Sequence, residues 1–163
     1  MFEDKTLAFI GSGQMAEAMI SGMLDKQIVQ SEQIIAAGPR AERAEELSTR
    51  YAIRTTTDNL TAVAGADIVV LSAKPQMFDD LLPHNHTAIT ECDFVISIAA
   101  GLSLSYLQSH FGNPRVVRSM PNTPAKIGKG ITVWVTTEAV DETQREQARL
   151  VLSSFGEEVF VDK

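Results

Sequence analysis

Short apolar runs rich in β-branched residues recur along this chain, and segments with helical periodicity separate them. Apolar runs without polar alternation are typical of strands that are covered on both faces of a parallel sheet. We therefore predict strands near residues 6–11, 33–37, 53–55, 67–72, 93–98, 115–120, 130–136 and 157–161.

The segment after the first predicted strand has the pattern of an amphipathic helix. Its apolar residues Ala16, Met19, Ile20 and Met23 recur at the spacing of one helix face, so this helix can bury a stripe against the sheet. Methionines in such a stripe indicate core packing rather than a cofactor site.

Start and end signals place the later helices. Helices are predicted near residues 40–50 and 59–64. Pro75 suits the first turn of another helix, and Ser103 or Ser105 can cap the next one. The last helix is predicted to run from a cap at Asp141 to an end at Gly156, with an inner face made of Ala148, Val151, Leu152 and Phe155.

The alternation of strands and helices predicts an α/β fold with a doubly wound sheet, mostly parallel, of about eight strands with helices on both faces. Residues 1–163 are predicted to form one domain. Such sheets bind ligands at the carboxyl ends of their strands, near the point where the strand order reverses. Residues that directly follow a predicted strand are therefore the candidates for a functional site.

Composition narrows the class of protein. With 44% hydrophobic residues the chain can bury a core, and a net charge of −7 argues against a nucleic-acid surface. The single cysteine, Cys92, excludes an internal disulfide and a cysteine-based zinc site. No apolar run has the length of a membrane span, and the N-terminus is too polar for a secretory signal. We expect a soluble, cytoplasmic protein that does not bind a membrane.

The first strand leads directly into the sequence Gly11-Ser-Gly13-Gln-Met-Ala16 and then into a helix. In a nucleotide site, Gly11 permits the tight turn and Gly13 lets a pyrophosphate approach the backbone. Ala16 takes the place of the third glycine, where helix and strand pack. The amides at the helix start then face the anion. The alternative is a packing turn in an ordinary α/β protein.

The end of the second strand bears on the choice of cofactor. No carboxylate follows Ile35-Ala-Ala-Gly38, whereas sites that prefer NAD usually place Asp or Glu there to bind the ribose. Arg40 or Arg43 could meet a 2′-phosphate, which favours NADP(H) and leaves NAD(H) as the second choice. The alternative is that both arginines belong to a solvated helix face, because Glu42, Glu45 and Glu46 lie among them.

Three further features follow strands or lie in loops. The small residues Ala99-Ala-Gly101 leave room for a flat ring, and Lys74 could donate to ribose or substrate oxygens, although each also fits an ordinary loop. His84 and His86 have no carboxylate or cysteine partners in the sequence, so we predict no metal site.

Four segments together resemble the N-terminal domain of pyrroline-5-carboxylate reductase. They are Phe9-Ile-Gly-Ser-Gly-Gln-Met-Ala16, Ala73-Lys-Pro-Gln76, Ser97-Ile-Ala-Ala-Gly101 and Arg118-Ser-Met-Pro-Asn-Thr-Pro-Ala125. The resemblance implies a Rossmann-type NAD(P)-binding domain over residues 1–163. It further implies reduction of 1-pyrroline-5-carboxylate to L-proline, the last step of proline biosynthesis. A protonated imine is already electrophilic, which agrees with the lack of an obvious acid–base pair.

The resemblance also implies a set of site residues, none of them catalytic. Ile10, Gly11, Ser12, Gly13, Gln14 and Met15 would form the pyrophosphate turn, with Gly38 and Arg40 near the 2′-phosphate and Asn59 by the adenosine half. Ser72, Ala73, Lys74 and Pro75 would lie by the linking phosphate and ribose, Ile98, Ala99 and Ala100 by the nicotinamide, and Met120, Asn122 and Thr123 beside the nicotinamide and the substrate. Gly38 replaces the serine common in the family, which leaves the 2′-phosphate to the arginines.

Members of this family continue into a helical dimerisation domain that binds the substrate carboxylate, and nothing in this sequence corresponds to it. We therefore expect this chain to bind cofactor and to turn over little or no substrate alone, whereas the full-length parent would be a homo-oligomer. Two other hypotheses for the function stay open. One is a related Rossmann reductase of hydroxy acids or other imines, and the other is a non-catalytic nucleotide-binding module.

Overall fold

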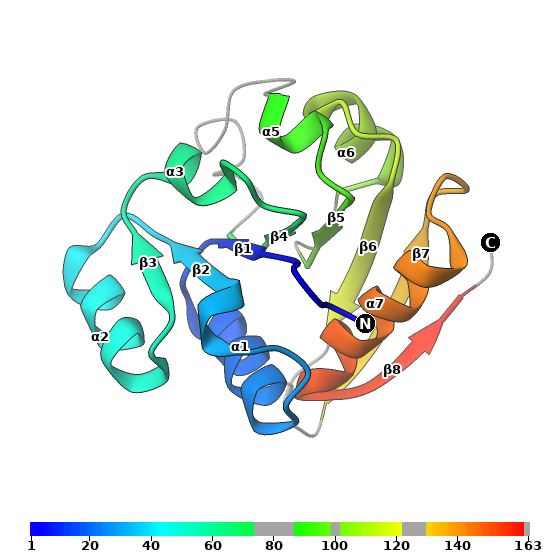
Figure 1. Cartoon of the computed structure of the whole chain (residues 1–163). Coiled ribbons are helices and arrows are strands. Elements are labelled where there is room, and N and C mark those ends of the chain that lie inside the picture. Colours follow the sequence, from blue (N-terminus) through cyan, green and yellow to red (C-terminus); the bar gives the residue numbers. More distant parts are fainter. Residues whose placement is uncertain (74–86, 99–101, 122–129, 162–163) are drawn as a thin grey trace.

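A computed structural model describes residues 1–73, 87–98, 102–121 and 130–161 (Figure 1). Its eight strands are β1 (Leu7–Ile10), β2 (Ile34–Ala37), β3 (Arg54–Thr56), β4 (Ile68–Leu71), β5 (Phe94–Ser97), β6 (Val116–Pro121), β7 (Gly130–Thr136) and β8 (Gly156–Phe160). Each predicted strand is confirmed, and its ends differ from the prediction by no more than one residue.

All eight strands belong to one sheet in the order β3-β2-β1-β4-β5-β6-β7-β8. Strands β1 to β6 are mutually parallel, β7 is antiparallel to β6, and β8 is parallel to β7. The predicted doubly wound, mostly parallel sheet is therefore confirmed. The strand order reverses between β1 and β4, which places the expected ligand position at the carboxyl ends of these two strands.

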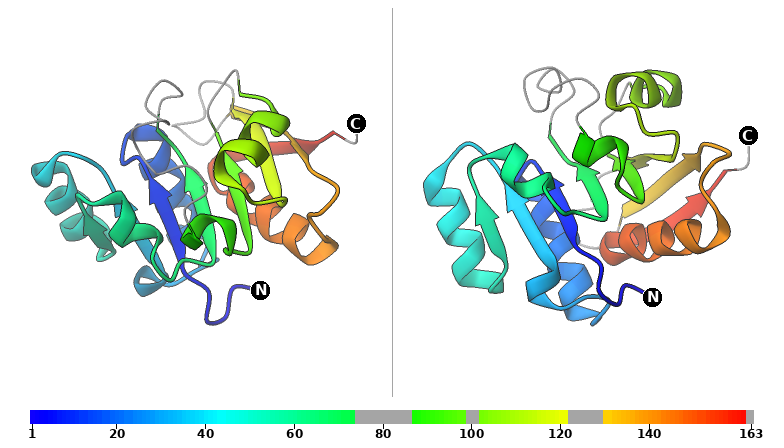
Figure 2. Two further views of the ribbon diagram at one scale, coloured as in Figure 1. Left: turned by 90° about the horizontal axis from the view of Figure 1, so that it is seen from above. Right: turned by 45° about the horizontal axis from the view of Figure 1, so that its top comes forward.

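Helices cover both faces of the sheet (Figure 1, Figure 2). They are α1 (Gln14–Asp25), α2 (Ala41–Tyr51), α3 (Asn59–Val63), α5 (Thr87–Thr90), α6 (Leu104–Phe111) and α7 (Glu142–Leu152), with 3-10 turns η1 (Ser31–Gln33) and η4 (Ser153–Phe155). Residues of α1, α2 and α7 pack in one core layer, and residues of α3, α5 and α6 pack in the other. The helix predicted to begin at Pro75 lies outside the described residues.

Alternating side chains of β1 supply both core layers. Leu7 and Phe9 join the layer under α1, whereas Ala8 and Ile10 join the opposite layer. All four residues are fully buried, as expected for a central strand of a two-faced sheet. The stripe predicted for α1 is also confirmed, because its four apolar residues are the buried ones of that helix.

The predicted caps are present, but the last helix ends earlier than expected. Ser103 rather than Ser105 caps α6, and Asp141 caps α7. Helix α7 ends at Leu152, where a 3-10 turn follows, and Gly156 begins β8 with a φ of 152°. The physical reason lies in the two serines of that turn: their hydroxyl groups donate to carbonyl oxygens three residues earlier and so compete with the helical pattern.

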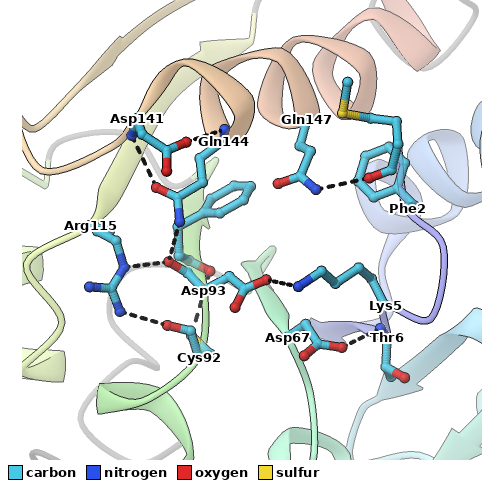
Figure 3. A network of polar contacts seen from close by, with 12 residues as sticks. Phe2, Lys5, Thr6, Asp67, Cys92, Asp93, Arg115, Asp141, Gln144 and Gln147 are labelled. Atoms are coloured by element: carbon cyan, nitrogen blue, oxygen red, sulfur yellow. Dashed lines mark hydrogen bonds and ion pairs between the residues drawn. The ribbon is translucent and has the colours of Figure 1, made fainter.

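A polar network joins the amino ends of the central strands (Figure 3). Lys5 pairs with Asp93 at 2.7 Å. The Arg115 Nε atom donates to the Asp93 carbonyl oxygen at 2.5 Å, and Gln144 of α7 donates to the same oxygen at 3.3 Å. These contacts tie the segment before β1 to the segment before β5 and to α7. The network therefore stabilises the sheet edge opposite the predicted ligand position.

Among the described residues, none of the helices has both the length and the apolar character needed to cross a bilayer.

Candidate functional site

The turn after β1 lies where hydrogen bonds join the carboxyl ends of three strands. The Gly11 amide donates to the Ala37 carbonyl at 2.9 Å, and the Ser72 amide donates to the Ile10 carbonyl at 2.9 Å. The Ser72 hydroxyl also donates to the Gly11 carbonyl at 2.8 Å. Gly11 has a φ of 110°, and a β-carbon there would lie 2.6 Å from the Ala73 nitrogen. Glycine is therefore required at this position.

Gly13 has a different role from Gly11. It is the N-cap of α1, without a side-chain cap, so the first amides of the helix have no side-chain acceptor. Apart from Gly13 itself and its two neighbours in the chain, no described residue has an atom within 4 Å of the position that a β-carbon of Gly13 would take. Open space beside the start of a helix without a side-chain cap is the geometry that accepts a pyrophosphate.

Arg43 of α2 reaches across to this turn. Its Nε atom donates to the Ser12 carbonyl at 2.7 Å, and its Nη2 atom donates to the Gly13 carbonyl at 3.3 Å. The guanidinium also pairs with Glu17 at 2.8 Å and with Glu46 at 2.5 Å. Burial lowers the pKa of Arg43, but hydrogen bonds to Glu46 and Glu17 outweigh that effect and raise it. All three guanidinium nitrogens therefore already have protein acceptors.

Glu17, in the first turn of α1, is the centre of a cluster that the sequence did not reveal. It accepts hydrogen bonds from Tyr51 at 2.6 Å and from both Arg43 and Arg50. Burial raises its pKa, yet these hydrogen bonds lower it to about 2. The carboxylate is thus charged at neutral pH and holds α1 against α2. No local pattern joins residues that lie this far apart in the chain.

The end of β2 brings Gly38 and Arg40 beside the glycine turn. The Gly38 amide donates to the Thr56 carbonyl at 3.2 Å, and the Ser12 hydroxyl occupies the space that a β-carbon at Gly38 would need. Arg40 is exposed at the N-cap of α2. Within the described ranges, no side chain pairs with its guanidinium. Of the two arginines considered for a 2′-phosphate, Arg40 is the one with free donors.

A cavity of about 450 Å³ opens between the starts of α1 and α2. Its lining combines the glycine turn, both arginines and three carboxylates: Gly13, Gln14, Glu17, Arg40, Glu42, Arg43 and Glu46. Glu17 and Glu46 are paired with arginines, so the exposed cation on this wall is Arg40. This cavity adjoins the start of α1 and has room for the adenosine side of a nucleotide.

The remaining site residues of the sequence analysis fall into two groups. Three of them are described by the structure. Asn59 is the first residue of α3, and the Ile98 amide donates to the Leu71 carbonyl at 3.1 Å. Met120 lies half-buried on β6 opposite Val133. The others lie outside the described residues: Lys74, Pro75, Ala99, Ala100, Asn122 and Thr123. The structure therefore brings together the residues around the glycine turn and leaves the nicotinamide side a prediction.

Within the described part of the chain, no group of three or more His, Cys, Asp or Glu side chains could hold a metal ion. His84 and His86 lie outside that part, so the expected absence of a metal site stays a prediction.

Comparisons with known proteins agree with this geometry. The family described as "NADP oxidoreductase coenzyme F420-dependent" matches residues 6–101. Pyrroline-5-carboxylate reductase of Pseudomonas aeruginosa is 40% identical over 96% of this chain and 57% of that protein. The Synechocystis enzyme of the same name is 34% identical over 95% of this chain and 58% of that protein.

The chain is also similar to solved structures of pyrroline carboxylate reductases. The pyrroline-5-carboxylate reductase of Coxiella burnetii matches with a TM-score of 0.91 and 27% identity, over 98% of this chain and 59% of that one. A structure of the Plasmodium falciparum pyrroline carboxylate reductase with NADP bound matches over 99% of this chain and 59% of that one. Its TM-score is 0.82 and its identity 24%, which shows a shared fold alone.

This chain therefore spans less than three fifths of the length of these relatives. The family match covers more than half of the chain and includes the glycine turn, the end of β2 and the end of β4. We conclude that the chain belongs to the family described as NADP oxidoreductase coenzyme F420-dependent, and that it is similar to pyrroline-5-carboxylate reductases over nearly its whole length.

Proposed function

We propose that this chain is the NADP(H)-binding part of a pyrroline-5-carboxylate reductase. The observation that carries the proposal is the turn at Gly11 and Gly13, which among the described residues leaves open space at the start of a helix that has no side-chain cap. The similarity to reductases of that name over nearly the whole chain supports the substrate. Such a reductase would convert 1-pyrroline-5-carboxylate to L-proline.

Arg40 supports NADP(H) over NAD(H). It lies at the N-cap of α2, where the helix start also favours an anion, and no carboxylate occupies the end of β2. A planar guanidinium with free donors suits phosphate oxygens. The exposed Glu42 on the same cavity wall reduces this preference, so NAD(H) is expected to bind more weakly rather than not at all.

The residues of this chain bind and orient rather than transfer protons. A nicotinamide bound here would supply the hydride. The amides of Gly13 and Gln14 would hold the pyrophosphate, and Ser72 would fix the turn through its bond to the Gly11 carbonyl. Ile98 and Met120 lie at the ends of neighbouring strands, where the resemblance places the nicotinamide. We propose no catalytic residue in this chain.

A titration tests the proposal. We expect NADPH to bind the chain more tightly than NADH at one ionic strength, measured by calorimetry. Arg40→Ala should weaken NADPH by about tenfold, as loss of a charge-assisted contact predicts, and leave NADH nearly unchanged. Arg54→Ala is the matched control, because Arg54 is also exposed but lies at the amino end of β3. Binding of neither nucleotide by the unaltered chain would overturn the proposal.

We also propose that the parent protein is a cytoplasmic homo-oligomer. The resemblance to the reductase family supports the assembly, and a single, buried cysteine suits a reducing compartment such as the cytoplasm. Light scattering of the parent protein gives the mass of the assembly directly, and a monomer would contradict this proposal.

A further inference from the structure

Arg43 touches two consecutive peptide groups of the glycine turn, although it belongs to a different helix. Its Nε and Nη2 atoms donate to the carbonyl oxygens of Ser12 and Gly13. In a trans peptide, the carbonyl of one residue and the amide of the next point in opposite directions. The amides of Gly13 and Gln14 are therefore turned away from Arg43.

That orientation matters because of what lies on the other side. Apart from Gly13 and its two chain neighbours, no described residue has an atom within 4 Å of the position of a Gly13 β-carbon, and no described side chain caps α1. The two amides thus point out of the turn at the start of α1, where a pyrophosphate would approach. A rotation of either peptide would withdraw one donor from this position.

The guanidinium itself is held in place by acids rather than left free. Glu17 of α1 and Glu46 of α2 pair with Arg43, whose side chain is only 12% exposed. Arg50 pairs with the same two carboxylates, so two arginines and two acids form a neutral cluster. A lysine could not serve four acceptors in this geometry, since its ammonium is a single point of charge.

We propose that Arg43 is a positioning residue for the pyrophosphate turn, which holds the amides of Gly13 and Gln14 towards the ligand and does not itself bind phosphate. This inference rests on the proposed binding of a dinucleotide. It separates the two neighbouring arginines, because Arg40 would bind the 2′-phosphate that only NADPH has, whereas Arg43 would orient the amides that face the pyrophosphate common to NADPH and NADH.

The test compares three variants by calorimetry with NADPH and NADH. Arg43→Gln should weaken both nucleotides about tenfold or more, with their affinity ratio unchanged, because two amide donors lose their orientation. Arg43→Lys keeps the positive charge and can replace the first variant in the test if Arg43→Gln unfolds. It should weaken the binding of both nucleotides by a smaller factor. Arg50→Gln is the matched control, since Arg50 joins the same acids without touching the turn, and its affinities should stay within about threefold.

A second readout separates orientation from general stability. In ¹⁵N spectra, inorganic pyrophosphate should shift the amide signals of Gly13 and Gln14 in the unaltered chain, and Arg43→Gln should reduce both shifts. Adenosine 2′-monophosphate should bind the variant and the unaltered chain equally, because it has no pyrophosphate.

Three results would overturn the inference. A selective loss of NADPH in Arg43→Gln would make Arg43 a 2′-phosphate ligand. Equal losses in Arg50→Gln would assign the effect to the acidic cluster as a whole, and unchanged affinities in both Arg43 variants would remove any role. If the unaltered chain binds neither nucleotide, the proposed function fails as well, which distinguishes that outcome from the others.

Discussion

Ser12 places its hydroxyl group in the space that a β-carbon at Gly38 would occupy. The contact joins the turn after β1 to the end of β2, so the glycine turn and the Gly38 backbone pack directly against each other. Since the obstacle is the end of a short side chain rather than backbone, the conflict created by a larger residue can be relieved.

Gly38→Ala should therefore destabilise the protein by about 1 kcal/mol, because Ser12 must rotate or shift. Combining it with Ser12→Ala should recover most of this loss, since the hydroxyl is then absent. Urea denaturation of both single variants and the double variant measures the coupling. Simple addition of the two single effects would contradict the contact.

Gly11 and Gly13 should respond differently to the same substitution. Gly11→Ala imposes a β-carbon on a φ of 110° and against the Ala73 backbone, so we expect a loss of about 2–4 kcal/mol. Gly13→Ala has open space, so its stability should change by less than about 1 kcal/mol while NADPH binding falls sharply. Thermal unfolding and calorimetric titration of the two variants, made side by side, check this contrast. A Gly13→Ala variant with undiminished affinity would argue against a pyrophosphate at the turn.

Glu17 should make stability depend on pH in the acid range. Its pKa is lowered from 4.5 to about 2 in the folded protein, so its contribution is complete above pH 4.5 and is lost as the pH falls towards 2. Glu17→Gln should lower the free energy of unfolding by about 1–2 kcal/mol at pH 7. The difference from the unaltered chain should shrink between pH 4.5 and 2.

Urea denaturation at several pH values gives this curve. Glu45→Gln is the control, because Glu45 is exposed and takes no part in the Glu17 cluster. A difference that stays constant down to pH 2 would show that Glu17 is not held as a carboxylate.

Cys92 should be unreactive in the folded state. Burial raises the pKa of its thiol to about 12, and its sulfur lies 3.2 Å from the Ile89 carbonyl. Because only the thiolate reacts, alkylation by iodoacetamide at pH 8 should be at least about 100-fold slower than in urea. Mass spectrometry over time measures both rates. Equal rates would place Cys92 at the surface.

The site shows how far local sequence signals reach. The turn at Gly11 and Gly13 was predictable because a strand, two glycines and a helix start follow one another within a few residues. Ser72 was expected to lie by the linking phosphate and ribose, which stays a prediction, and the structure adds that its hydroxyl donates to the Gly11 and Ile10 carbonyls. A serine that follows a strand has the same sequence pattern in either role.

Local sequence patterns do not distinguish the contacts of Arg40 from those of Arg43. Arg40 and Arg43 were equivalent in sequence, since both lie near the start of a helix after a strand that ends without an acid. Only the structure shows that Arg43 reaches the Ser12 and Gly13 carbonyls, 31 and 30 residues away in the chain. The partner that holds it, Glu17, lies 26 residues away and belongs to another helix.

The sequence by itself determined the eight strands, the apolar stripe of α1, the cap of α7 and the glycine turn. Each of these depends on a period of two or 3.6 residues or on neighbouring positions. Only the tertiary structure decided the early end of α7, the packing of Ser12 against Gly38 and the contacts of Arg43 with the Ser12 and Gly13 carbonyls. These features arise where separate elements meet, and the distances between their side chains depend on how the sheet aligns the helices rather than on any local pattern.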